Sequence, residues 1–208
     1  ISLLEAWHIP FEELENTSAQ KNRALKVLGR ILDFIASPED GEKLALVMEE
    51  CFEAGEYYEY LVKYRPEKLL YPLEEADYAQ IPEELRNSSS WSDLSRKLDL
   101  LRELLEFPTT NVEKLIIEIA DKLDFDREEK ALAQKVAGDV RFLRSQKKYR
   151  GLGSLAAELL KVKNTFSYFA GIVWDLKGYE PKPGVVTIST YHKSKGLEWD
   201  VVFLTGLN

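Results

Sequence analysis

The sequence holds little of the chemistry that metal sites and disulfides need: one cysteine, two histidines and one methionine among 208 residues. A single cysteine cannot form an internal disulfide, and Cys51 lies in "LVMEECFEAG", whose apolar spacing is typical of a helix face. Structural zinc sites use four nitrogen or sulfur ligands, which so few histidines and cysteines cannot supply. We therefore expect no metal site in these residues.

Long apolar runs are also absent, since no stretch approaches the roughly 18 residues of a membrane-spanning helix. The start, "ISLLEAWHIP", lacks the basic head and cleavage site of a signal peptide, and it lacks an initiator methionine. We therefore expect no membrane association, a cytoplasmic location, and a chain that is part of a longer protein.

Excess positive charge is missing from the chain as a whole, whose formal net charge is −8. This balance argues weakly against a surface that is basic all over and coats nucleic acid. The charge is uneven, however, because residues 130–163 hold nine basic and two acidic side chains. The sequence therefore leaves room for one basic face on an otherwise acidic protein.

Helical periodicity is what the chain has in abundance. Apolar residues at three- and four-residue steps predict a helix over 24–36, and Ser37 before Pro38 is the predicted cap of the next helix. Tyrosines and prolines in 57–82 predict short helices and turns. Further helices are predicted over 41–55, over 90–107, from Thr110 or Asn111, over 127–149 and from Ser154 to about Trp174.

The pattern changes after a turn-rich linker, "KGYEPKPG" (177–184). The β-branched run "GVVTIST" predicts a strand, and "VVFLT" (201–205) predicts a second one. Short apolar strands of this kind are typical of a parallel sheet that is buried on both faces. Two such strands are marginal alone. Their neighbours are therefore expected from chain outside these residues or from "HIPFEEL" near the start.

The loop "TYHKSKGLEW" (190–199) joins the two predicted strands. A strand that ends at Thr190 delivers its last side chains to the carboxyl edge of a sheet, where open α/β sheets bind ligands. The loop supplies donors, positive charge, a permissive glycine, a carboxylate and an apolar anchor: His192, Lys193, Lys195, Gly196, Glu198 and Trp199. These residue types suit a phosphate or a sugar. A merely solvated polar loop is the alternative, and the residue types alone leave both open.

The order of residues in this loop, with "VVTIS" before it and "DVVFLTGL" after it, resembles motif V of the UvrD/Rep/PcrA-like superfamily I DNA helicases. That motif reads T-x-H-x-(S/A)-K-G-L-E-(F/W)-x-x-V, with a strand on each side. Upstream, "LLEAWHIPFEELEN" resembles the helix, strand and loop that follow motif IV in this family. "NRALKVLGRILDFIASPEDGEKL" resembles the helix and turn that come next.

The resemblance implies a mainly α chain in three parts. In the family, a helical subdomain called 2B is inserted into a RecA-like α/β motor subdomain of the P-loop NTPase type, called 2A. Residues 1–40 would then be the first part of 2A, residues 41–183 the helical 2B-like insertion, and residues 184–208 the return to 2A with motif V. The 2A segment would be incomplete, with a few short strands.

The resemblance also implies a function: ATP-dependent strand separation and translocation on single-stranded DNA, in DNA repair or recombination. By this resemblance Gly196 and Glu198 lie nearest the nucleotide, and Glu198 accepts a hydrogen bond from a ribose hydroxyl. Thr190 and His192 face the DNA backbone, where a hydroxyl and an imidazole can donate to phosphate. Lys195 serves either ligand. The implied partners are single-stranded DNA, a duplex junction and the remaining helicase subdomains.

A phosphate loop of the form G-x-x-x-x-G-K-[ST] is absent from these residues, and so is an acidic pair for magnesium beside a strand. We therefore expect ATP and Mg²⁺ to be used by the parent protein, and this stretch alone to be inactive. Two alternatives remain open. One is a subunit of an AddA/RecB-type helicase–nuclease, and the other is a non-catalytic interaction module derived from a helicase.

A second candidate site lies in the basic stretch "RFLRSQKKYRGLGSLAAELLKVK" (141–163). Lys147, Lys148 and Arg150 precede Gly151 and Gly153, and G-x-G between two helices resembles the hairpin with which helix-hairpin-helix modules contact duplex DNA. Basic side chains at a helix C-terminus also complement the helix dipole without any ligand. The sequence leaves duplex contact and a solvated face both open.

Overall fold

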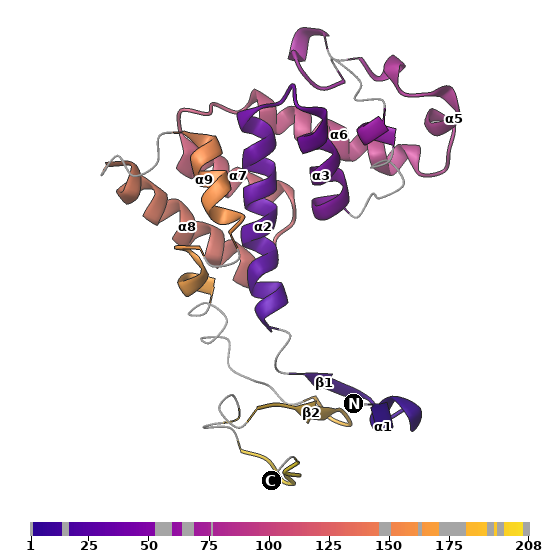
Figure 1. The fold of residues 1–208 in the computed structure, drawn as a ribbon, viewed down its shortest axis with the longest axis vertical. Helices are drawn as coiled ribbons and strands as arrows, with labels where there is room; N and C mark the ends of the chain where they lie inside the picture. Colours follow the sequence, from indigo (N-terminus) through magenta and orange to yellow (C-terminus); the bar gives the residue numbers. More distant parts are fainter. Residues whose placement is uncertain are drawn as a thin grey trace.

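The chain folds into a body of helices above a smaller part that contains two strands and both ends of the chain (Figure 1). The computed structural model describes residues 2–13, 17–52, 60–63, 69–75, 77–145, 151–161, 164–170, 182–190, 194 and 198–205. We call residues 17–170 the helical body, and residues 2–13 with 182–205 the sheet piece. The predicted mainly α fold class is confirmed.

The helical body is built from six longer helices and several short ones in the described ranges. The longer ones are α2 (Thr17–Ala36), α3 (Gly41–Phe52), α6 (Trp91–Glu106), α7 (Val112–Lys122), α8 (Arg127–Ser145) and α9 (Leu152–Leu159). The short ones are η2 (Leu73–Glu75), η3 (Tyr78–Gln80) and α5 (Glu83–Arg86). The short helices and turns that the sequence predicts for 57–82 are confirmed where that segment is described.

Helix α2 is the centre of the helical body, and it packs against α9, α3, α8 and α7 (Figure 1). Its apolar residues are completely buried around most of its circumference, among them Leu28, Ile31 and Phe34. Gly29 permits the close approach of α9, since a Cβ atom there would lie 2.9 Å from Cγ of Leu160. The core of the described residues therefore forms around α2, which contacts the helices that pack on either side of it.

Two predicted helix starts have different outcomes. Asn111 caps α7 as predicted, because its side-chain oxygen accepts a hydrogen bond from the backbone N–H of Lys114 at 3.1 Å. The cap predicted at Ser37 is wrong. The carbonyl of Ser37 closes a turn by accepting from the N–H of Asp40, and Asp40 is the residue that caps α3, accepting from the N–H of Glu42 at 3.0 Å.

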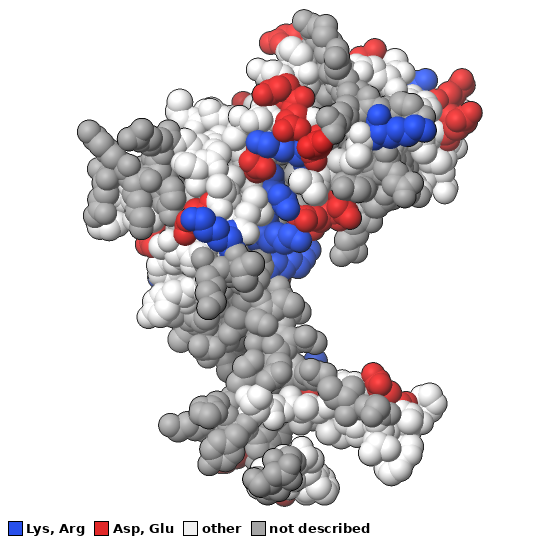
Figure 2. Space-filling model, in the orientation of Figure 1, with Lys and Arg blue, Asp and Glu red and all other residues white. Residues whose placement is uncertain are grey.

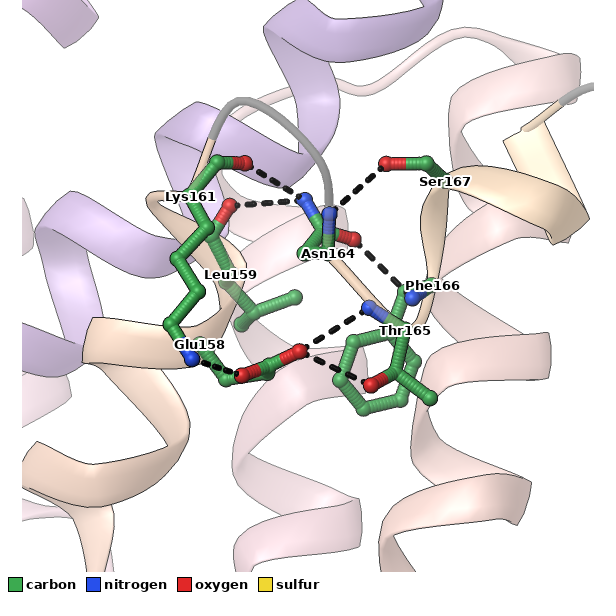
Figure 3. Close-up of polar contacts among 7 residues, drawn as sticks. All are labelled: Glu158, Leu159, Lys161, Asn164, Thr165, Phe166 and Ser167. Carbon is green, nitrogen blue, oxygen red and sulfur yellow. Dashed lines mark hydrogen bonds and ion pairs between the residues drawn. The ribbon is translucent and has the colours of Figure 1, made fainter.

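The long helix predicted from Ser154 to about Trp174 is also wrong, because α9 ends at Leu159. The side-chain amide of Asn164 donates to the carbonyls of Leu159 and Lys161, and so satisfies acceptors that the end of a helix leaves free (Figure 3). The side-chain oxygen of the same residue accepts from the N–H of Phe166, just before a new helical turn at 167–170. Asn164 therefore ends one helix and begins the next.

Glu158 also stabilises this break in the helix, through residues on both sides of it (Figure 3). One of its carboxylate oxygens accepts from the N–H and the hydroxyl of Thr165, at 2.9 and 2.8 Å, and the other accepts from Lys161 at 2.6 Å. The hydrogen bond from Lys161 is the largest cause that lowers the pKa of Glu158 to about 2, and the bonds from Thr165 lower it further. The charged carboxylate is thus the form that fits the fold.

Replacing Glu158 with alanine is expected to lower the free energy of unfolding by about 1–2 kcal/mol near neutral pH, because the N–H of Thr165 loses its charged acceptor. The pKa is lower in the folded state, so this stabilisation is present above the ordinary value of 4.5 and is lost as the pH falls toward about 2. Urea unfolding across that range measures the difference between variant and wild type. Lys161→Ala is the comparison, and should cost less than Glu158→Ala because both hydrogen bonds from Thr165 to Glu158 remain. If the difference in unfolding free energy between Glu158→Ala and wild type is constant with pH, the role given to the charged Glu158 carboxylate is wrong.

Candidate functional site

The two strands of the sheet piece pair in parallel, although residues 14–185 lie between them in the sequence. β1 (Phe11–Glu13) lies beside β2 (Val186–Ile188), with Phe11 opposite Val186 and Glu13 opposite Ile188. The N–H of Val186 donates to the carbonyl of Pro10 at 2.8 Å. The sequence-based expectation that "HIPFEEL" supplies a neighbouring strand is confirmed. Since the pair is parallel, both carboxyl ends lie at the same edge, and Thr190 follows two residues after β2.

A tight turn fixes the start of β2 beside β1. The N–H of Val185 donates to the carbonyl of Lys182 at 3.2 Å, and Gly184 has φ of 78°, as the third residue of a type II turn requires. The ammonium group of Lys182 binds the carboxylate of Glu12 on β1 at 2.7 Å. This part of the predicted turn-rich linker is confirmed. It holds the register that brings Thr190 to the sheet edge.

The carbonyl of Thr190 accepts two hydrogen bonds from described residues of this region. The N–H of Ser194 donates to it at 3.1 Å, and the hydroxyl of Ser189 donates to it, also at 3.1 Å. Thr190 and Ser194 therefore lie close together, next to the carboxyl edge of the strand pair.

Glu198, Trp199 and Asp200 are the next residues of the loop that the structure describes. Glu198 and Asp200 are exposed, whereas Trp199 is half-buried, as expected of an apolar anchor. Among the described residues, none covers the carboxylate of Glu198 in a closed core. An exposed carboxylate next to an anchored indole is suited to accept hydrogen bonds from hydroxyl groups of a ligand.

Several predicted site residues lie outside the described residues. These are His192, Lys195 and Gly196 of the loop, and Lys147, Lys148 and Arg150 of the basic stretch. Their roles stay predictions. The strand predicted over 201–205 is not found, since these residues join no strand pair in the described part of the chain, and Val201, Val202, Phe203 and Leu204 are 61–86% exposed.

Gly151 and Gly153, predicted as duplex contacts, lie at the start of α9. The hydroxyl of Ser154 donates to the carbonyl of Gly151 at 2.8 Å and lies 3.3 Å from its N–H. A Cβ atom at Gly153 would meet only Ala36, at 3.8 Å, and one at Gly151 would meet nothing within 4 Å. Packing against α2 therefore does not require glycine at either position. Whether they contact a duplex stays a prediction.

Basic residues on α2 are a feature that sequence reasoning missed. Arg23, Lys26 and Arg30 recur at steps of three and four residues, a spacing that places them on one face of the helix. That signal was present in the sequence, next to the apolar face that predicts the helix. Arg23 binds Glu129 of α8 at 2.8 Å, and Lys26 and Arg30 both bind Glu50 of α3.

The ion pairs of Arg30 and Lys26 influence the pKa of Glu50 on α3, and burial influences that of Cys51 beside it. Burial alone would raise the pKa of Glu50, but hydrogen bonds from Arg30 and Lys26 outweigh burial and hold this pKa below its ordinary value. Burial raises the pKa of the neighbouring Cys51 thiol to about 12. A thiol with so high a pKa is unreactive, which agrees with its interpretation as a core residue.

Two kinds of site can be recognised by geometry and apolar length: metal-binding groups of side chains and membrane-spanning helices. The described residues hold no group of three or more His, Cys, Asp or Glu side chains that could bind a metal ion. Within the same residues, no helix has the length and apolar character to cross a bilayer. Comparisons of the chain with protein-family models, with curated proteins and with solved structures find no match.

Proposed function

We propose that this chain belongs to an ATP-dependent DNA helicase of the UvrD/Rep/PcrA type, in which it supplies motif V and a helical insertion. The observation that carries the proposal is the parallel pairing of β1 with β2. In the sequence, β1 precedes the helical body and β2 follows it. An insertion into an α/β subdomain leaves this arrangement, because the chain must return to the strand beside the one that it left.

The exposed apolar side chains of the sheet piece support the same proposal. Parallel sheets are normally covered on both faces. Here Trp7 is 70% exposed, Phe203 is 86% exposed, and Leu3 and Val186 are exposed as well. A RecA-like subdomain in the full-length protein would supply further strands and helices to cover these residues.

The position of Thr190 supports the proposed chemistry. This residue follows β2 at the carboxyl edge of a parallel pair, where α/β proteins bind nucleotides. In the proposal, Thr190 donates from its hydroxyl to a DNA phosphate, and Glu198 accepts from a ribose hydroxyl of ATP. The exposure of both side chains fits these roles. The groups that bind the β- and γ-phosphates and Mg²⁺ would come from other parts of the protein.

Replacing Thr190 with alanine in the full-length protein is expected to weaken single-stranded DNA binding roughly five- to tenfold, because one hydrogen bond to phosphate is worth about 1–1.5 kcal/mol. Fluorescence anisotropy with a labelled oligothymidylate measures this loss. Ser189→Ala is the matched control, since it removes a neighbouring hydroxyl that bonds within the chain. Equal affinities of Thr190→Ala and wild type would remove the DNA role of this residue.

A further inference from the structure

The cations of α2 form a line along one side of the helical body. The side chains of Arg23 and Lys26 are 58% and 53% exposed, and that of Arg30, one turn later, is 22% exposed. Figure 2 shows basic side chains gathered over the middle of α2, with acidic side chains beside them. A helix rises about 1.5 Å per residue, so this line is about 10 Å long.

Lys161 extends the line onto α9. Leu160, the residue before it, lies against Gly29, which falls between Lys26 and Arg30 on α2. Lys161 follows the last turn of α9 and is 61% exposed. We call Arg23, Lys26, Arg30 and Lys161 the basic band. Its members come from two helices that are far apart in sequence but pack side by side.

Three cations of the basic band are more exposed than the carboxylates that they bind. Glu129 is 8% exposed behind Arg23, Glu50 is 19% exposed behind Lys26, and Glu158 is 15% exposed behind Lys161. Arg30 is about as buried as Glu50, which it shares with Lys26. A ligand that approaches from solvent therefore meets the side chains of Arg23, Lys26 and Lys161 first, although each of them is paired.

We propose that the basic band binds the sugar–phosphate backbone of a DNA strand outside motif V. The proposal rests on the proposed function, which gives the full-length protein a polyanionic ligand. One strand of B-DNA advances about 3.4 Å per phosphate, so about three phosphates match the length of the line. Lysine and arginine side chains supply most such contacts, which fix position without reading sequence.

The test is salt-dependent binding of labelled oligothymidylate and of a blunt duplex to the 208-residue chain. The Lys26→Gln/Lys161→Gln variant keeps the fold, because Glu50 retains Arg30 and Glu158 retains Thr165. We expect roughly tenfold weaker binding at low salt, and a slope of log affinity against log salt that is smaller by about 2. Arg86→Gln/Lys114→Gln is the matched control, with the same loss of charge at exposed positions on α5 and α7.

Several outcomes would contradict DNA binding by the basic band. One is an unchanged DNA affinity of the Lys26→Gln/Lys161→Gln variant. Another is a loss that appears only when Lys147, Lys148 and Arg150 are changed. A third is binding of polyglutamate as tight as binding of DNA, which would indicate an acidic protein partner instead. The double variant should leave the KM for ATP of the full-length protein unchanged, so a failure of the basic band is distinguishable from a failure of motif V.

Discussion

Replacing Glu198 with alanine in the full-length protein is expected to raise the KM for ATP roughly 10- to 100-fold and to leave DNA affinity nearly unchanged. A hydrogen bond to a charged acceptor is worth about 1.5–3 kcal/mol, and its loss weakens nucleotide binding directly. The carboxylate is exposed at the sheet edge, where a nucleotide can reach it. Steady-state ATP hydrolysis measures the effect.

Two comparisons sharpen this experiment. Asp200→Ala removes another exposed carboxylate two residues away, and should change the KM for ATP less than about twofold, within the range of ordinary surface changes. An ATP analogue that lacks both ribose hydroxyls should bind wild type and Glu198→Ala with similar affinity, because the interaction is already absent. If Glu198→Ala discriminates between ATP and the analogue as strongly as wild type does, the ribose role is wrong.

Replacing Phe34 with alanine is expected to lower the free energy of unfolding by about 3–5 kcal/mol. This side chain is fully buried in α2, which contacts four other helices, so the surrounding core cannot collapse around the cavity easily. Urea unfolding measures the loss, and the more conservative Phe34→Leu keeps the measurement possible if alanine prevents folding.

Phe142 on α8 provides the matched control for Phe34, because its ring is 59% exposed. Phe142→Ala removes the same atoms from a surface position, and should cost less than about 1 kcal/mol. If Phe34→Ala and Phe142→Ala lower the free energy of unfolding by similar amounts, α2 is not the centre of the core.

Local signals in the sequence predicted the parts of the fold that depend on a few neighbouring residues. Asn111 caps α7 because its side chain reaches an N–H three residues later, and this requires nothing from elsewhere in the chain. The apolar steps from Leu25 to Ile35 likewise predicted the buried face of α2. The helix itself begins earlier, at Thr17, where the sequence is polar.

Periodicity failed where apolar spacing continues across a break. Leu155 and Leu159 are followed at helical steps by Phe166 and Ala170, so the pattern alone predicts one helix. The break depends on Asn164, which competes for the backbone through both ends of its amide. Asparagine is one of the preferred N-cap residues, so Asn164 itself was the available signal.

The candidate site was predictable in position and only partly in environment. The change of period at Val185 and the order of residues from Thr190 to Glu198 located it. The partner strand at Phe11–Glu13 needed a contact with Val186–Ile188, far away in the sequence, which the sequence only suggested. The basic band needed the packing of α9 on α2, which brings Lys161 beside cations that are far away in sequence.

The central claim is that the loop after β2 contacts ATP and DNA together, and ATP hydrolysis by the full-length protein with and without single-stranded DNA tests it most directly. If the loop contacts both ligands, hydrolysis should rise severalfold with DNA, and Thr190→Ala should shift the DNA concentration that gives half of this rise. Hydrolysis that does not respond to DNA, or an inability to hydrolyse ATP at all, would contradict the helicase proposal.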